Sequence, residues 1–321
     1  MRKNLHKIYK LFELEVLSFS DYRKFKNNFA SEKDKKNESN IKAWILQDKH
    51  RIEKGLSLPE PRLGFGGEVL KRLDFNLKEY LNVVGEDEVF LIGVGAFKAY
   101  ENFHSSLGFI LPDEIKSIFT NYKKFYELEL TNSVGLKESI TSPLTSQQLK
   151  HFFSTRSSCR KYNMEKHIDK NLLIEAVDMA KLTPSVCNRQ PWRVNFFKGH
   201  ELNEILKLQN GNTGFGDNIP CIAVVTSDLG AFYSPSERNQ AFVDGGMFSM
   251  SLLYSLHSLG LSACALNWCD TFGVRKKFSK LNYINQSEIV NMIIAIGYTD
   301  DGVQVAKSPR LKTDGFYTIH W

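Results

Sequence analysis

The chain has 321 residues, which is long enough for one large domain or two ordinary ones with a hydrophobic core. Its hydrophobic residues (42%) and charged residues (24%) occur in the proportions of an ordinary globular protein. No apolar run approaches the roughly 18–20 residues that cross a bilayer, so we expect no membrane span. Five cysteines without regular spacing argue against a disulfide framework and favour the reducing cytoplasm.

The composition points to neither a metal nor a nucleic acid. The eight histidines are scattered, and no Cys/His grouping has the spacing of a zinc site. The net charge of +6 suits anionic ligands, but the chain lacks the basic and aromatic stripe typical of a nucleic-acid binder. The basic segment 1–10 also lacks the continuous apolar run of a secretory signal. We therefore expect a small-molecule partner and no metal.

The first 140 residues are predicted to form a mainly α-helical domain. Apolar residues recur at helical spacing over 41–56 and again over 69–84. Pro112, followed by two acidic residues, is a typical helix start, and the apolar spacing continues from it to Phe125. We expect a charge-rich break at 31–40 and a loop rich in glycine and proline at 57–67.

Two motifs of this helical half allow a functional interpretation. His50 to Gly55, followed by Arg62, is explained most simply as a salt-bridged helix end with a glycine C-cap. The alternative is a lid or specificity element in which Arg51, Lys54 and Arg62 face an anionic substrate. Gly93 to Gly95 lacks the strand, third glycine and acidic residue of a dinucleotide fingerprint, so we interpret it as close helix packing.

The polar stretch 131–143 is the expected domain boundary, which divides the chain into domains 1–140 and 141–321. Thr145 to Gln148 then has the form of a capping box, which opens a helix through Phe153. Helical and strand patterns alternate beyond it and predict an α+β fold, a central sheet flanked by helices. The expected elements are helices at 170–182, 201–208 and 237–259, strands at 194–198, 221–226, 262–267 and 290–297, and a last strand at 316–321.

A polar loop bounded by prolines lies between the helix at 170–182 and the strand at 194–198. Its Ser, Asn and Gln side chains and free backbone N–H groups can hydrogen-bond the polar edge of a flat ring. The residues are Pro184, Ser185, Val186, Asn188 and Gln190. The alternative is that these side chains bond their own backbone in turns.

Two basic clusters complement this loop, because arginine and serine are suitable donors for a phosphate dianion. They are Arg156, Ser157, Ser158 and Arg160 upstream of the loop, and Lys307 and Arg310 near the C-terminus. A ring-binding loop and a phosphate site together suggest flavin mononucleotide (FMN). The alternative for the basic clusters is a solvated surface.

These motifs, in this order, resemble the nitroreductase family of FMN-dependent oxidoreductases over roughly residues 145–321. The resemblance also rests on a long helix from Asp244, on Cys264 to Trp268 and on the strand from Ile293. It implies a nitroreductase-like fold with a mostly antiparallel sheet. It further implies a homodimer with FMN at the subunit interface, the basic clusters coming from one subunit and the loop from the other. Contacts to the ring are implied for Leu266, Asn267 and Trp268.

The activity implied by the resemblance is hydride transfer from NAD(P)H through FMN to a small acceptor. No Ser-His-Asp set or paired carboxylates occur in the matching half, so no catalytic side chain is assigned. The alternatives are a flavin-dependent oxidase or dehydrogenase of a biosynthetic intermediate, and a non-catalytic flavin-binding scaffold. We expect Trp192 to pack in the core. Cys187 and Cys269 are either redox-active or, more simply, small hydrophobic residues.

Overall fold

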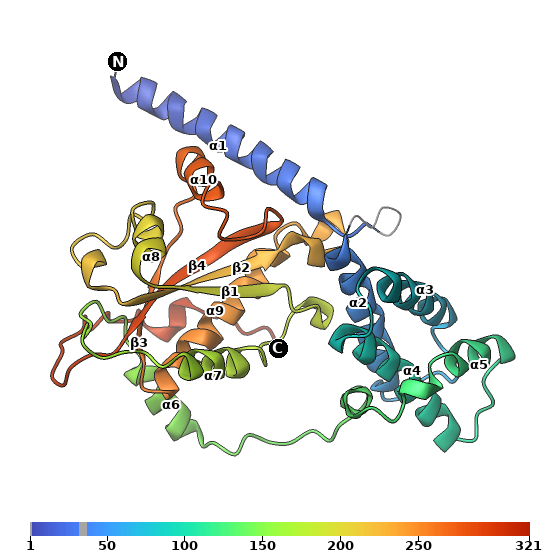
Figure 1. Ribbon diagram of the computed structural model, residues 1–321. Helices are drawn as coiled ribbons and strands as arrows, with labels where there is room; N and C mark the ends of the chain where they lie inside the picture. Colours follow the sequence, from blue (N-terminus) through green and yellow to red (C-terminus); the bar gives the residue numbers. More distant parts are fainter. Residues whose placement is uncertain (1, 32–36) are drawn as a thin grey trace.

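The chain consists of a helical N-terminal part and a mixed part built on a single sheet (Figure 1). The computed structural model describes residues 2–31 and 37–321, and the expected break at 31–40 lies partly outside these residues. The described helices of the N-terminal part are α1 (Arg2–Asn28), α2 (Glu38–Leu56), α3 (Gly67–Val83), α4 (Glu88–Ser106) and α5 (Asp113–Thr120), followed by the short 3-10 turns η1 (Lys123–Phe125) and η2 (Glu129–Ser133).

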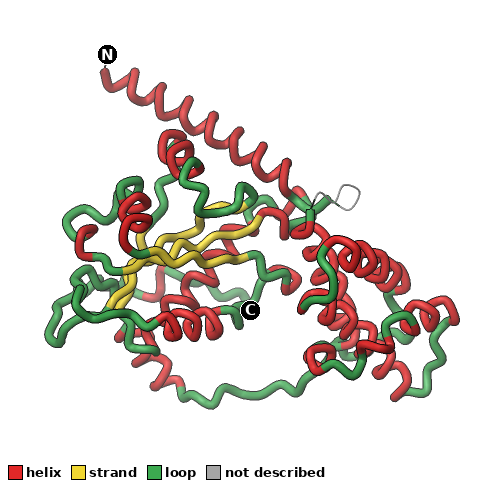
Figure 2. The backbone as a smooth tube through the Cα atoms, viewed as in Figure 1, coloured by secondary structure: helices red, strands yellow, loops and turns green. Residues whose placement is uncertain are grey.

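The mixed part contains a four-stranded antiparallel sheet with the strand order β1-β2-β4-β3. Its strands are β1 (Trp192–Phe197), β2 (Cys221–Asp228), β3 (Ser262–Leu266) and β4 (Glu288–Gly297). Its helices are α6 (Ser146–Thr155), α7 (Lys170–Ala180), α8 (Gly199–Leu206), α9 (Gln240–Ser258) and α10 (Phe272–Ser279). Figure 2 shows this sheet, in yellow, between layers of helices. The predicted α+β fold with an antiparallel sheet and a helical N-terminal part is therefore confirmed.

Each face of the sheet carries its own hydrophobic core, because successive side chains of a strand point to opposite faces. Cys221, Ala223 and Val225 of β2 pack with α7 and α9, whereas Ile222 and Val224 pack with α8 and α10. Strand β2 is buried along its whole length. This double burial explains why its sequence reads as a continuous apolar run.

The helical part has a separate core between α2, α3 and α4, and Gly93 of α4 packs closely against it. A Cβ atom at Gly93 would lie 2.7 Å from Leu77 Cδ2 and 2.9 Å from Ile45 Cγ2. Gly95 is equally constrained, since its Cβ would lie 2.8 Å from the carbonyl oxygen of Thr131. The interpretation of Gly93 to Gly95 as close helix packing is confirmed.

We expect Gly93→Ala to lower the free energy of unfolding by about 1–3 kcal/mol, the usual cost of forcing an extra methyl group into a packed core. Gly273→Ala in α10 is the control, because a Cβ there meets no atom within 4 Å. Urea unfolding of both variants tests the contrast. A Gly93 variant as stable as the Gly273 variant would contradict the packing argument.

Helix α1 extends away from the body, and it contacts α10 and the segment around Leu229 of the mixed part through its C-terminal third (Figure 1). There Phe25 packs with Leu229 and Phe232, and Arg275 of α10 donates to Ser20 at 2.9 Å and pairs with Asp21 at 2.8 Å. The N-terminal helices therefore share contacts with the sheet region, and the division at residue 140 stays a prediction. Segment 134–145, which joins η2 to α6, contains neither helix nor strand.

Most predicted elements are present with ends shifted by a few residues. The loop at 57–67 separates α2 from α3, and the capping box is formed by the side chains of Thr145 and Gln148. The helix after Pro112 ends at Thr120 instead of continuing to Phe125, and a 3-10 turn replaces its last part. No helix among the described residues is both long and apolar enough to cross a membrane.

The predicted strand at 316–321 is wrong for the isolated chain. These residues are exposed and irregular, and they follow the 3-10 turn η7 (Thr313–Gly315). A strand needs a neighbour that takes up its backbone hydrogen bonds, and no strand of the described sheet pairs with this segment. Helix α10 was not predicted, because its short sequence carries little apolar periodicity.

Candidate functional site

The two predicted basic clusters meet at one cavity of about 590 Å³. Segment 156–160 reaches it directly after α6 and is held along β3, where Ser158 bridges Ala263 and the Cys159 amide donates to the Ala263 carbonyl at 3.2 Å. The C-terminal segment 306–310 forms the opposite wall. The polar groups in the lining are Arg156, Ser157, Ser158, Arg160, Lys307, Ser308 and Arg310, with Ser154 and Tyr254 beside them.

None of the described residues that line this cavity is acidic. Four positive charges and several hydroxyl groups therefore converge without a carboxylate to neutralise them. A structural cluster of this kind would be unfavourable by itself, but a bound phosphate would offset the repulsion. The chemistry of these donors fits the phosphate of FMN.

Aromatic packing positions α6, and with it the arginine segment. Phe153 of α6 stacks on Tyr254 of α9, with ring centroids 5.0 Å apart, and Phe152 packs against Tyr254 and His257. Because Arg156 is the first residue after α6, this contact places its backbone at the cavity.

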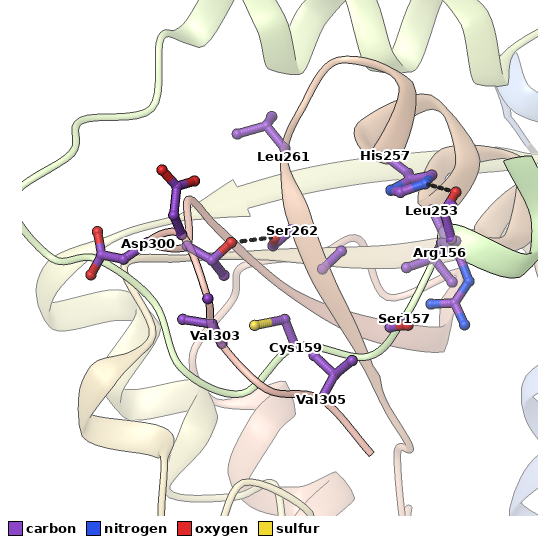
Figure 3. Close-up of a pocket in the computed structure, with 15 residues that line it drawn as sticks. Arg156, Ser157, Cys159, Leu253, His257, Leu261, Ser262, Asp300, Val303 and Val305 are labelled. Carbon is purple, nitrogen blue, oxygen red and sulfur yellow. Dashed lines mark hydrogen bonds between the residues drawn. The ribbon is translucent and has the colours of Figure 1, made fainter. Parts of the chain in front are cut away.

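A second cavity of about 300 Å³ adjoins the first and shares Arg156 and Ser157 with it. Figure 3 shows His257 and Arg156 at one end of this cavity and Asp300 and Val303 at the other. His257 is hydrogen-bonded to the Thr155 hydroxyl at 3.0 Å, and burial, with a smaller contribution from Arg156, lowers its pKa. The carboxylates of Asp300 and Asp301 make this cavity the poorer phosphate site.

The loop of Pro184 to Gln190 has an unusual backbone conformation. Cys187, Asn188 and Gln190 have φ values of 49°, 51° and 50°, in the left-handed region that side-chain-bearing residues seldom adopt. Each such residue costs on the order of 1–3 kcal/mol, so the surrounding structure must hold the loop in place. The short turn η3 (Val186–Asn188) is the centre of this loop.

Arg189 is the main support of the loop, and it is 1% exposed. Its guanidinium donates to the backbone carbonyls of Val186 at 3.2 Å and Ala231 at 2.9 Å, and it forms a two-point ion pair with Glu237. From the other side, Asp244 of α9 accepts the Val186 amide at 3.2 Å. No role was predicted for Arg189 or Glu237, because nothing in a local pattern shows that a loop arginine is buried.

The loop side chains differ in their availability to a ligand. The Ser185 hydroxyl accepts the Gln190 amide at 3.0 Å, and the Gln190 side chain donates to the Asn188 carbonyl at 3.3 Å. These two contacts favour the turn-forming interpretation for Ser185 and Gln190. In the described part of the chain, no residue hydrogen-bonds the side-chain amide of Asn188, which leaves it free for a ring edge.

Within one chain the loop and the basic cavity do not meet. The loop contacts α9 at Asp244, whereas the cavity borders α9 at Met250 and Tyr254. Asp244 lies six residues before Met250 and ten before Tyr254, which corresponds to roughly 9–15 Å along a helix. The chain therefore presents the two predicted halves of the site at different places.

Strand β3 runs from the cavity toward Leu266, Asn267 and Trp268, the residues for which ring contacts were predicted. Ala263 pairs with Ser158, and Leu266 follows three residues later, roughly 10 Å further along the strand. Leu266 is buried, the backbone carbonyl of Asn267 accepts Gln209 at 2.8 Å, and Trp268 packs edge-on against Phe278. These three residues do not line the basic cavity, and their contact with a ring stays a prediction.

Trp192 packs in the core as expected, because its indole stacks on Phe248 with centroids 4.9 Å apart. All five cysteines lie in the described range and are unpaired. Cys187 is half-buried and Cys269 is exposed, and a redox role for either stays a hypothesis.

The motif from His50 to Gly55 is a salt-bridged helix end, as predicted. Lys49 pairs with Glu53 at 2.9 Å. The C-cap was assigned wrongly, since α2 continues to Leu56 and is capped by Ser57. Gly55 instead leaves room for the ring of Phe65, which would lie 2.1 Å from a Cβ atom.

Comparison with known proteins identifies the region that carries these motifs. Residues 154–212 match the model of the Nitroreductase family. The matched range contains both the arginine segment 156–160 and the loop 184–190. The predicted resemblance is confirmed for this range. No curated protein matches the chain.

Several solved structures are similar to just over half of the chain. A nitroreductase family protein from Streptococcus pneumoniae has 19% identity and a TM-score of 0.46, over 54% of this chain and 100% of its own. A nitroreductase with bound FMN from Desulfitobacterium hafniense has 22% identity and a TM-score of 0.41, over 56% and 100%. A protein from Parabacteroides distasonis, named as a possible NADH dehydrogenase or NAD(P)H nitroreductase, has 18% identity and a TM-score of 0.46. The match covers 55% of this chain and 100% of that protein.

Proposed function

We propose that this chain, which matches the Nitroreductase family over residues 154–212, is an FMN-dependent oxidoreductase that passes hydride from NAD(P)H to a small acceptor. The observation that carries the proposal is the cavity of about 590 Å³, lined by four cationic side chains and, among the described residues, no acid. Arg156, Arg160, Lys307 and Arg310 would bind the phosphate of FMN. Ser157 and Ser158 would complete its hydrogen-bond shell.

The position of β3 supports the same assignment. A flavin joins its phosphate to its ring by a five-carbon chain, so the ring must lie several bonds away from the arginines. Leu266 ends β3 roughly 10 Å from the Ser158–Ala263 bridge and Asn267 follows it, at a distance suited to the ring. When bound, FMN would supply two-electron chemistry between NAD(P)H and the acceptor. The acceptor gains two electrons and two protons, and we assign no side chain as the proton donor.

We propose a homodimer in which the loop 184–190 of one subunit faces the cavity of the other. The lining of the cavity supports this arrangement, because within one chain no residue of the loop 184–190 lines it. Exposed apolar residues near the loop would be covered in such an interface: Leu182 is 82% exposed and Phe242 is 56% exposed. The exposed C-terminal segment, with Trp321 at its end, would pair with the partner's sheet.

The proposed function predicts a yellow protein that releases FMN, and not FAD, on denaturation. The reason is that the basic cavity has donors for one phosphate group, and the sequence lacks a dinucleotide fingerprint. Absorbance spectra and chromatography of the released flavin measure this. A colourless protein that does not bind added FMN would overturn the proposal.

Steady-state oxidation of NADH and NADPH with quinone and nitroaromatic acceptors distinguishes an enzyme from a flavin-binding scaffold. Sedimentation of the flavin-loaded protein at micromolar concentration tests the dimer, and a flavin-loaded monomer would contradict it.

We also propose a cytoplasmic location, since all five cysteines are unpaired.

A further inference from the structure

One face of α2 lies along the proposed ring-binding loop. Helix α2 contacts both η3 and the 3-10 turn η5 (Leu229–Ala231) of the mixed part. Gln47, Arg51 and Lys54 recur every three or four residues, so they share one side of the helix, and His50 lies at its edge. Tyr233 connects this face to the loop, because the guanidinium of Arg51 lies 5.9 Å and that of Arg189 lies 5.0 Å from its ring centroid.

The acidic residues near this face are already engaged with other groups. Asp48 accepts two hydrogen bonds from Arg72, at 2.9 and 2.7 Å, and its side chain is fully buried. Glu53 binds Lys49 at 2.9 Å and accepts the Gly135 amide at 3.1 Å. Arg51 shares Asp48 with Arg72 through a longer ion pair of 3.7 Å, which is too long for a hydrogen bond, and its side chain is 37% exposed.

Two neutral groups on the same face also have unused hydrogen-bonding capacity. In the described part of the chain no residue hydrogen-bonds His50; its pKa is lowered, by burial first and then by Lys49, with Arg189 among the smaller causes. The ring is therefore neutral at pH 7 and able to donate one hydrogen bond and accept another. Gln47 is 2% exposed, and its Oε1 atom has no partner among the described residues.

We propose that Arg51 and His50 bind an anionic group of the acceptor, next to the ring that is held against the loop 184–190. Arg51 supplies the positive charge, His50 a hydrogen bond, and Tyr233 orients the guanidinium. The acceptor is thus a carboxylate- or sulfonate-bearing small molecule. This inference rests on the proposed function and names the substrate class of its site.

The basic cavity for the FMN phosphate is a different place. It is lined from α6, α9, the arginine segment and the C-terminal segment, and no residue of α2 contributes. The cationic face of α2 is therefore not needed for the cofactor. It lies beside the loop that would hold the ring edge, where the second substrate must approach.

The test compares 4-nitrobenzoate with 4-nitrobenzamide, two acceptors of nearly the same shape that differ in charge, with NAD(P)H as reductant and the FMN-loaded protein. We expect Arg51→Ala to raise the ratio of KM for the benzoate to KM for the benzamide by about 10-fold or more, the effect of losing a charge-assisted hydrogen bond. In Arg51→Lys, which keeps the positive charge, the KM ratio should lie between that of Arg51→Ala and that of the unmodified protein. Arg23→Ala is the matched control: Arg23 also lies 5.9 Å from an aromatic ring, that of Phe19, but on α1.

Each outcome separates this inference from the proposed function. A yellow, active protein in which Arg51→Ala leaves the ratio unchanged overturns the inference alone. A loss that is equal for both acceptors also overturns it, because a purely structural role predicts that result. If the yellow protein turns over neither acceptor, the two acceptors are compared by binding instead. The ratio of the Kd for 4-nitrobenzoate to the Kd for 4-nitrobenzamide, measured from the flavin absorbance, should then rise in Arg51→Ala, and an unchanged ratio overturns the inference. A colourless protein overturns the proposed function, and this inference with it.

Discussion

Replacing Arg189 by alanine is expected to lower the free energy of unfolding by about 3–5 kcal/mol, the typical cost of breaking a buried ion pair from one side. The side chain of Arg189 is fully buried and that of Glu237 is 13% exposed, so the glutamate would lose its cationic partner and keep only the Tyr233 amide, at 2.9 Å. Two backbone carbonyls, of Val186 and Ala231, would lose their donor as well. Urea unfolding followed by circular dichroism measures the change.

Lys181→Ala provides the control for this experiment. Lys181 pairs with Asp178 at 2.7 Å, but both side chains are more than half exposed (58% and 57%), so the expected loss of unfolding free energy is small. Similar losses for the two variants would show that the Arg189–Glu237 pair does not stabilise the folded chain. The loss of unfolding free energy in Glu237→Gln should fall between those of the two variants, since glutamine keeps the shape of the side chain and one acceptor for the guanidinium.

Arg160→Ala is expected to weaken FMN binding by roughly 10-fold to 100-fold. The change removes a donor to a dianionic phosphate, and a hydrogen bond to a charged group contributes about 1.5–3 kcal/mol. Arg160 is exposed and lies at the rim of the cavity, so the chain should fold normally without it. Titration of FMN into the apo variant, followed by quenching of flavin fluorescence, gives the affinity.

Arg51→Ala is the comparison for this titration, because we assign Arg51 to the acceptor and not to the cofactor. Its FMN affinity should stay within about twofold of the unmodified protein. An Arg160 variant with the affinity of the unmodified protein would remove Arg160 from the phosphate site. A weakened Arg51 variant would instead place the cofactor against α2.

Local signals explain why much of the fold could be predicted. Thr145 and Gln148 form their capping box from residues three apart, and β2 is apolar on both faces because helices cover both faces of the sheet. Gly93 was recognised as a packing glycine, since the motif lacked the other parts of a nucleotide site. Such features depend on neighbours in sequence, so the sequence is enough to indicate them.

The features that could not be predicted from the sequence depend on contacts between residues far apart in the chain. The support of the loop by Arg189 requires Ala231 and Glu237, more than 40 residues away. The end of the chain at 316–321 has the alternation of a strand, but no strand in the described chain pairs with it. By contrast, the Arg156 and Lys307 segments were expected to form one phosphate site from the chemistry of their donors, and the fold brings both to the lining of one cavity.

The left-handed residues of the loop have a consequence for ligand affinity. Cys187, Asn188 and Gln190 adopt this conformation in the folded chain. Arg189 and Asp244 hold them there, so the conformational cost is met when the chain folds. A ring bound at this loop would then meet amide groups that the fold already positions, and less of its binding energy would be spent on ordering the loop. Loosening the support would therefore reduce affinity without removing a single contact to the ligand.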